Sequence, residues 1–194
     1  MRLTGGAAPK ILKGIPVSSG IVIGKAHVVE TSHIKIVYQY LLDEKQVERE
    51  VERFLDAIHA TGEQLKRLKE DMPEPIKSHG FIIDTHLMIL QDSMLRDATV
   101  EKIRNDQINA EWALRKSLRE IRRLFEKIED PYIRGRIDDV EDVTDRIMRN
   151  LAGQEDPPLG DITQRVIVVA HKLSPADTSE MDVNKVMGFI TDMG

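Results

Sequence analysis

The chain has 194 residues, of which 41% are hydrophobic, 31% charged and 4% aromatic, and its formal net charge is −5. This acidic balance argues against a nucleic-acid binder, and the absence of cysteine excludes disulfides and thiolate zinc sites. No apolar run reaches the ~18 residues of a membrane span, and no signal-peptide pattern opens the chain. After a loose leader, MRLTGGAAPK, we expect a soluble, cytoplasmic and largely helical protein.

The first patterned region is rich in β-branched residues. Residues 11–42 contain short runs of Ile and Val, interrupted by Gly14, Gly20 and Gly24. Such runs are typical of short strands joined by tight turns. We expect these glycines to serve turns in the β layer and to bind nothing.

From Asp43 the pattern becomes helical. Apolar side chains recur three and four positions apart over residues 43–72, which predicts a long amphipathic helix that Pro73 and Pro75 end. Its predicted buried stripe is Val47, Val51, either Phe54 or Leu55, Ile58, Leu65 and Leu68.

Three further helical segments follow. The first covers residues 76–90, with a break at Asp92–Ser93 before a continuation over 94–105. The others cover 110–128 and 132–151. Four helices with one apolar stripe each must bury those stripes together, which predicts a four-helix bundle.

The last part returns to an α/β pattern. A linker with Pro157, Pro158 and Gly160 precedes a buried strand over 165–173, a short helix over 174–181 and a buried closing strand at Val186–Thr191. With the first region, this predicts about four or five strands.

The strands on the two sides of the bundle form one sheet only if they meet in space. We therefore predict a mostly α, α+β fold, in which a bundle of residues 43–153 is inserted into a discontinuous α/β domain of residues 11–42 and 154–194. The two crossings, near Leu42 and Gln154, would act as a two-strand hinge.

Five collinear segments resemble the N-terminal half of Enzyme I of the bacterial sugar phosphotransferase system, the phosphoenolpyruvate–protein phosphotransferase. They are GIPVSSGIVIGKA (14–26), EREVERF (48–54), THLMILQDSML (85–95), YIRGRIDDVEDVTDRIMRNLAG (132–153) and LSPADTSEMDVNKVMGFITDMG (173–194). Their common order over nearly the whole chain makes the resemblance specific. It implies that the α/β part is an incomplete phosphohistidine swivelling domain.

The resemblance also implies which parts are absent. In this family the strand resembling GFITD runs into a Gly-Arg-Thr-Ser-His motif, whose histidine accepts the phosphoryl group from phosphoenolpyruvate. That motif would begin at or after Gly194. A C-terminal barrel that binds phosphoenolpyruvate and magnesium would follow, so Mg²⁺ has no site in this chain. We expect the fragment not to take phosphate from phosphoenolpyruvate, and to be a monomer or a weak self-associate, whereas the full-length family is homodimeric.

A docking role for the second helix comes from the same resemblance. In the family this segment helps to bind the histidine-containing phosphocarrier protein, which receives the phosphoryl group. Carried over position by position, the docking residues are Phe81, Ile82, Thr85, His86, Met88, Ile89, Asp92 and Leu95. Helical spacing alone favours another interpretation, in which Met88 and Ile89 are core residues and His86 lies at the boundary.

The rim of this predicted surface departs from the family pattern. Lys77 and Ser78 stand where glutamates are usual, and Met94 stands where an acidic residue is typical. Charge complementarity sets partner choice and association rate. The partner is therefore expected to be a carrier with a less basic surface, or a paralogous carrier.

Two further residues are assigned roles by the resemblance. Arg136 matches an arginine of the family's docking helix, where a guanidinium would stabilise a transferring phosphoryl group. The alternative is a helix salt bridge with Asp139 or Asp142. Thr178 matches a threonine whose hydroxyl lies near the family's active histidine; the alternative is an ordinary helix residue after an N-cap at Ser174.

The histidines of the chain do not predict a metal site or a replacement acceptor. A phosphohistidine relay needs an exposed imidazole whose second nitrogen is held by an acceptor. We expect His59 on a solvated helix face and His171 at the sheet edge. His79 and His86 share a helix face, but two turns are too wide for a compact metal pair.

Three functions remain open at this point. The first is the phosphocarrier-docking part of Enzyme I, which we favour. The second is the same part of the nitrogen-regulatory paralogue, which carries a sensory domain ahead of this region. The third is a helical adaptor without chemistry.

Overall fold

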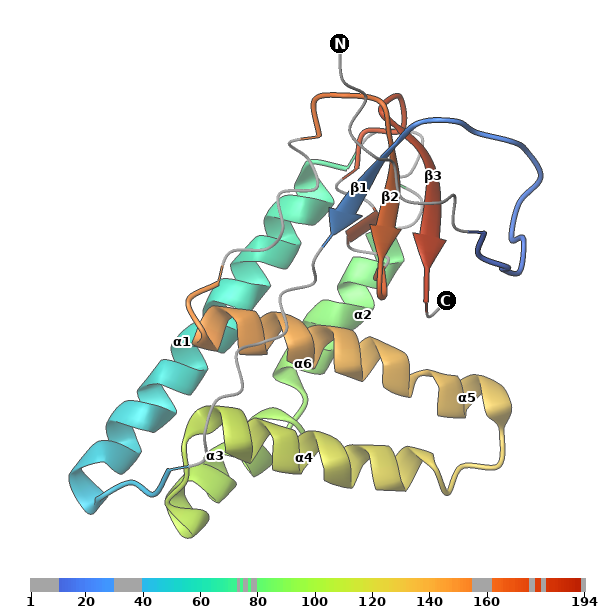
Figure 1. The fold of residues 1–194 in the computed structure, drawn as a ribbon. Helices are drawn as coiled ribbons and strands as arrows, with labels where there is room; N and C mark the ends of the chain where they lie inside the picture. Colours follow the sequence, from blue (N-terminus) through green and yellow to red (C-terminus); the bar gives the residue numbers. More distant parts are fainter. Residues whose placement is uncertain are drawn as a thin grey trace.

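The computed structural model describes residues 11–29, 40–72, 74, 77, 80–154, 162–174, 177–178 and 181–192. Its elements are β1 (Lys25–Val29), α1 (Glu44–Glu70), α2 (Gly80–Gln91), α3 (Arg96–Asp106), α4 (Ala110–Phe125), α5 (Pro131–Gly135), α6 (Ile137–Leu151), β2 (Val166–Ala170) and β3 (Val186–Thr191). Figure 1 shows a helical bundle with a small sheet above one end of it. The predicted leader, Pro73, Pro75, Ser78, His79, the linker at 157–160 and Gly194 lie outside the described residues.

Helix α1 begins at a capping box, which fixes its first turn. The Asp43 carboxylate accepts a hydrogen bond from the Gln46 backbone N–H at 2.9 Å, and the Gln46 side chain accepts one from the Asp43 N–H at 3.0 Å. Phe54 is buried and Leu55 is exposed, which resolves the predicted alternative in favour of Phe54. The rest of the predicted stripe is buried, except that Ile58 is half-buried.

The bundle is built from α1, the broken helix α2–α3, α4 and α6. Helix α1 packs against each of the others, and α6 also packs against α2 and α4. The predicted break at Asp92–Ser93 is confirmed, because residues 92–95 form a turn between α2 and α3. The predicted single helix over 132–151 is wrong: it divides into α5 and α6 at Gly135–Arg136, where glycine weakens the helix.

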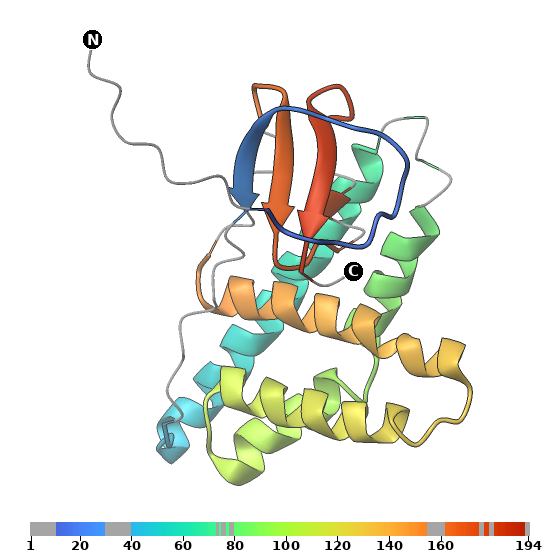
Figure 2. The same ribbon diagram turned by 45° about the vertical axis from the view of Figure 1, so that its right-hand side comes forward.

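The sheet joins the two ends of the chain. Its three strands run parallel in the order β1-β2-β3, and Lys25 of β1 pairs with Val166 of β2. The prediction that strands before and after the bundle meet in one sheet is confirmed. Figures 1 and 2 show the carboxyl ends of the strands directed toward α6.

Two strand predictions are wrong. Within the described part of residues 11–42, β1 is the one strand of this sheet, and residues 11–24 form neither helix nor strand. β3 has the predicted bounds but is not buried, since Phe189 and Ile190 are about half exposed. A β-branched run becomes a strand only where its backbone groups find a neighbour, and only residues 25–29 reach β2.

The segment before β1 lies across the sheet. Figure 2 shows it passing in front of the strands. An added Cβ at Gly24 would meet the flexible end of the Met187 side chain of β3, which can shift, so close approach alone does not require glycine there. Gly20 has φ +139°, which L side chains rarely adopt, whereas Gly14 has no such requirement.

None of the helices in the described residues combines the length and hydrophobicity needed to cross a membrane.

Candidate functional site

The outer face of α2 is unusually apolar for an exposed helix surface. Phe81 is 60% exposed and Met88 is 73% exposed, while Ile82, Thr85 and Ile89 are half-buried. The core interpretation of Met88 is therefore wrong, and its side chain is available to a partner. An exposed cluster of flexible apolar side chains is typical of a binding surface.

Two predicted docking residues lie in the interior. His86 is 2% exposed and Leu95 is 1% exposed, so neither side chain can touch a partner on this surface. Leu95 belongs to the bundle core. The prediction that His86 and Leu95 contact the partner is therefore corrected: both are interior residues that pack beneath the surface.

Asp92 is exposed and shapes the turn that ends α2. Its carboxylate accepts a hydrogen bond from the Met94 backbone N–H at 2.7 Å, and its carbonyl accepts one from the Arg96 N–H at 2.9 Å. These bonds fix the turn that exposes Met94 next to the α2 face.

Arg136 lies at the junction of α5 and α6 and is held from two sides. Its Nη1 donates to Asp139 Oδ2 at 3.2 Å, its Nη2 donates to the Tyr132 hydroxyl, and its guanidinium lies 4.6 Å from the centroid of the Tyr132 ring. The predicted salt bridge with Asp139 is thus present. These hydrogen bonds raise the pKa of Arg136, so the group is a fixed cation.

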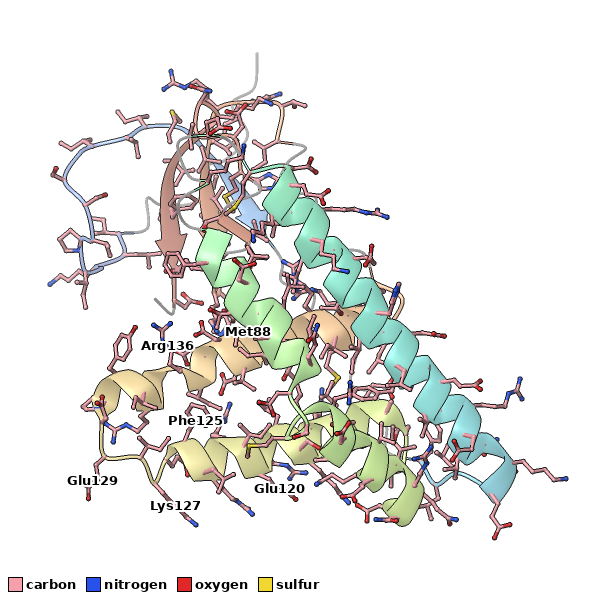
Figure 3. All side chains as sticks on the ribbon, turned by 180° about the vertical axis from the view of Figure 1, so that it is seen from behind. Met88, Glu120, Phe125, Lys127, Glu129 and Arg136 are labelled. Atoms are coloured by element: carbon pink, nitrogen blue, oxygen red, sulfur yellow. The ribbon has the colours of Figure 1, made fainter. Side chains whose placement is uncertain are left out.

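Sequence reasoning missed the contribution of α4 and α5 to this surface. Figure 3 shows Met88, Phe125 and Arg136 bordering the same area between α2, α4 and the α5–α6 junction. Phe125 is half-buried, and Tyr132 and Ile133 are exposed. We call the exposed Phe81 and Met88 of α2 the apolar patch, with Arg136 at its rim. The sequence did contain a signal for this contribution: Tyr132 and Ile133 are adjacent apolar residues in a short helix that has no buried residues.

A polar cluster lies beneath the patch, where α2 and α6 meet the sheet. His86 Nε2 is 3.9 Å from Asp139 Oδ1 and has no hydrogen-bond partner in the described structure. Lys172, just after β2, pairs with Asp142 of α6 at 2.6 Å. Burial raises the pKa of Asp142, and the Lys172 ammonium opposes that rise. Asp142 thus pairs with Lys172, and Arg136 pairs with Asp139, so the alternative salt bridge between Arg136 and Asp142 is not formed.

Thr178 lies on the sheet side of the molecule. Ser174 and Asp177 cap each other's backbone N–H groups at 3.1 and 2.9 Å, as expected for an N-cap at Ser174. The exposed Thr178 hydroxyl donates to the Ser174 carbonyl at 3.3 Å.

Across the described residues, no three His, Cys, Asp or Glu side chains are grouped so as to hold a metal ion.

Comparison with known proteins gives matches over most of the chain. Residues 13–136 match the family described as PEP-utilising enzyme, N-terminal. The phosphoenolpyruvate-protein phosphotransferase of Cupriavidus necator is 40% identical over 196 residues, covering 96% of this chain and 33% of that protein. The protein of the same name from Bacillus subtilis is 36% identical, covering 94% of this chain and 32% of that protein.

Solved structures agree with this relationship. A solution NMR structure of an Enzyme I protein superposes with a TM-score of 0.77 at 31% identity, covering 90% of this chain and 71% of that chain. The N-terminal domain of Enzyme 1 - Nitrogen gives a TM-score of 0.62 at 22% identity and shares the fold.

Together, the fold and these matches define the N-terminal region of a PEP-utilising enzyme. Within that class, the chain belongs to the Enzyme I family and corresponds to its N-terminal domain. It spans about a third of the length of the curated relatives it matches.

Proposed function

We propose that this chain is the phosphocarrier-docking part of a phosphoenolpyruvate–protein phosphotransferase that works in the cytoplasm. Such an enzyme takes a phosphoryl group from phosphoenolpyruvate on a histidine and passes it to the histidine-containing phosphocarrier protein. The observation that carries the proposal is the apolar patch, with a fixed cation at its rim, on a chain of this family. Phe81 and Met88 would supply the contact area, and the half-buried Ile82, Thr85 and Ile89 its edge.

Arg136 and Thr178 would act on the phosphoryl group. The Arg136 guanidinium is ready-oriented by Tyr132 and Asp139, and it would offer charge-assisted hydrogen bonds to the phosphoryl oxygens of the docked carrier. The exposed Thr178 hydroxyl would support the family's acceptor histidine at the sheet.

Replacing Met88 by Ala tests the docking proposal. Truncating a flexible apolar anchor should weaken binding of the carrier by ~1–2 kcal/mol, which is roughly 5- to 30-fold in Kd. Calorimetric titration of the chain with the phosphocarrier measures this directly. NMR shift changes should map to residues 81–95 and to the region of Arg136.

Val183→Ala is the matched control, because Val183 is 78% exposed but lies in the turn before β3. It should leave the affinity unchanged. Titration with both the sugar-system carrier and the nitrogen-system carrier separates the alternatives. Tighter binding of the nitrogen-system carrier would favour the paralogue, and binding of neither would favour an adaptor.

A further inference from the structure

The carboxyl ends of β2 and β3 bring together a histidine and a carboxylate that are 21 positions apart in the sequence. Ala170 and Thr191 are register partners, so the next residue on each strand lies beside the other. His171 Nδ1 is 3.1 Å from Asp192 Oδ2, and the Asp192 backbone N–H donates to the His171 carbonyl at 3.2 Å. The strand pairing thus fixes the backbone of this pair and places the two side chains within hydrogen-bond distance of each other.

This contact determines which ring nitrogen of His171 carries the proton. An ionised carboxylate can only accept a hydrogen bond, so Nδ1 must be the donor. In the neutral ring, Nε2 is then left with its lone pair. The His171 side chain is 64% exposed, and within the described part of the chain Nε2 has no hydrogen-bond partner.

The other described histidines lack this combination. His86 is buried, so its Nε2 cannot be reached from solvent. His27 and His59 are exposed, but in the described structure neither has a carboxylate hydrogen-bonded to its ring. An exposed nucleophile whose second nitrogen is held by a carboxylate is the arrangement that histidine uses to form covalent intermediates.

We propose that His171 Nε2 is a phosphoryl-accepting site for small N-phosphoryl donors of the phosphoramidate class. This site is distinct from the acceptor histidine of the Enzyme I family and does not depend on the docking function. It lies where parallel α/β sheets place their ligands, at the carboxyl ends of the strands.

In the transfer step, the Nε2 lone pair attacks phosphorus, an N–P bond forms to His171, and the P–N bond of the donor breaks. In the zwitterion of phosphoramidate the nitrogen is already protonated, so it departs as neutral ammonia while the phosphoryl group passes to Nε2. The ring keeps its proton on Nδ1 and becomes a phosphoimidazolium cation. The Asp192 carboxylate stabilises that positive charge through the existing hydrogen bond.

The test is to incubate the full chain with phosphoramidate and follow the rate at each histidine by peptide mass spectrometry and ³¹P NMR. We expect His171 to be modified about five-fold or more faster than His27 and His59, and its product to be Nε2-phosphohistidine. Equal rates at the three histidines, or modification of His171 at Nδ1, would overturn the proposal.

Variants identify the cause of the difference. Asp192→Asn should bring the His171 rate down to that of His59, and His171→Asn should remove the fast signal. Asp97→Asn, an exposed aspartate on α3, should change nothing. Backbone amide spectra of each variant check that β2 and β3 remain folded. An unchanged His171 rate in folded Asp192→Asn would contradict the role of the pair.

Discussion

His86 lies in the interior where α2 packs against α6, with charged groups on several sides. Burial lowers its pKa, while Asp139, Asp142 and Asp177 raise it and Arg146 lowers it. Burial is the largest of these effects, so the folded protein favours the neutral ring. The unfolded chain has no such restriction and binds a proton near the ordinary pKa of about 6.5.

The free energy of unfolding should therefore depend on pH through the protonation of His86. The folded pKa is depressed, so the unfolded chain binds more protons below about pH 6.5 and unfolding becomes easier as the pH falls. Above about pH 6.5 the ring is neutral in both states, so His86 causes no loss of stability there. His86→Gln removes the titration, so its free energy of unfolding should fall less than the parent's between about pH 7.5 and about pH 5.5, as urea denaturation measures.

His59→Gln is the matched control on the exposed face of α1, and it should keep the parent's pH dependence. A parent-like slope in His86→Gln would show that the buried ring does not titrate in this range.

At the scale of elements, Arg53 ties three helices together. Its Nη1 donates to the Leu151 carbonyl at the end of α6, and its Nη2 contacts Glu50 of α1 at 2.6 Å and Glu111 of α4 at 2.7 Å. Both carboxylates are buried, and Glu50 also accepts from the Ala110 N–H at 2.8 Å. Burial alone lowers the pKa of Arg53, but the two glutamates outweigh it and raise that pKa.

Arg53→Met should leave two buried carboxylates without their cation. Breaking a buried ion pair costs roughly 3–5 kcal/mol, and we expect about 2–4 kcal/mol because Arg53 is itself about a third exposed. Chemical denaturation measures the loss. Arg104→Met removes an exposed pair with Glu48 and should change stability little. Equal effects of the two variants would show that the buried network contributes nothing special.

Over the whole molecule, the bundle and the sheet are joined by charge pairs as well as by the chain itself. Lys172 bonds Asp142 at 2.6 Å, and Asp177 lies 3.6 Å from Arg146. Lys172 and Asp177 follow β2, while Asp142 and Arg146 belong to α6. The pairs therefore connect the bundle to the sheet part. The chain itself passes between these two parts near Leu42 and Gln154, and the pairs would oppose motion at this predicted hinge.

Lys172→Met should loosen this connection. It leaves the buried Asp142 carboxylate without its partner, which we expect to destabilise the sheet part by about 1–2 kcal/mol and to raise the pKa of Asp142 further. Residual dipolar couplings would then fit different alignments for bundle and sheet. Lys102→Met removes a pair within the bundle and should keep one common alignment. A single alignment for Lys172→Met would argue against the bridge.

Local pattern was enough to predict α1 and the bounds of β3. The period of apolar residues in 43–72 predicted α1 and its buried face, because a helix with one apolar stripe has one way to bury it. The bounds of β3 follow from a short apolar run with a polar residue after it. The order of the patterned regions predicted the insertion of the bundle into the sheet domain, and the five collinear segments predicted the family. The exact domain boundaries stay a prediction.

Tertiary structure decided which side of each element is free. Helix α2 carries apolar residues at most positions, so spacing could not tell that Met88 faces solvent and His86 the interior. The helices that pack against α2 determine which of its sides is buried. Likewise, no local pattern places His171 beside Asp192. Their contact exists because two strands distant in sequence pair in parallel register, and pairing between strands is a property of the folded sheet.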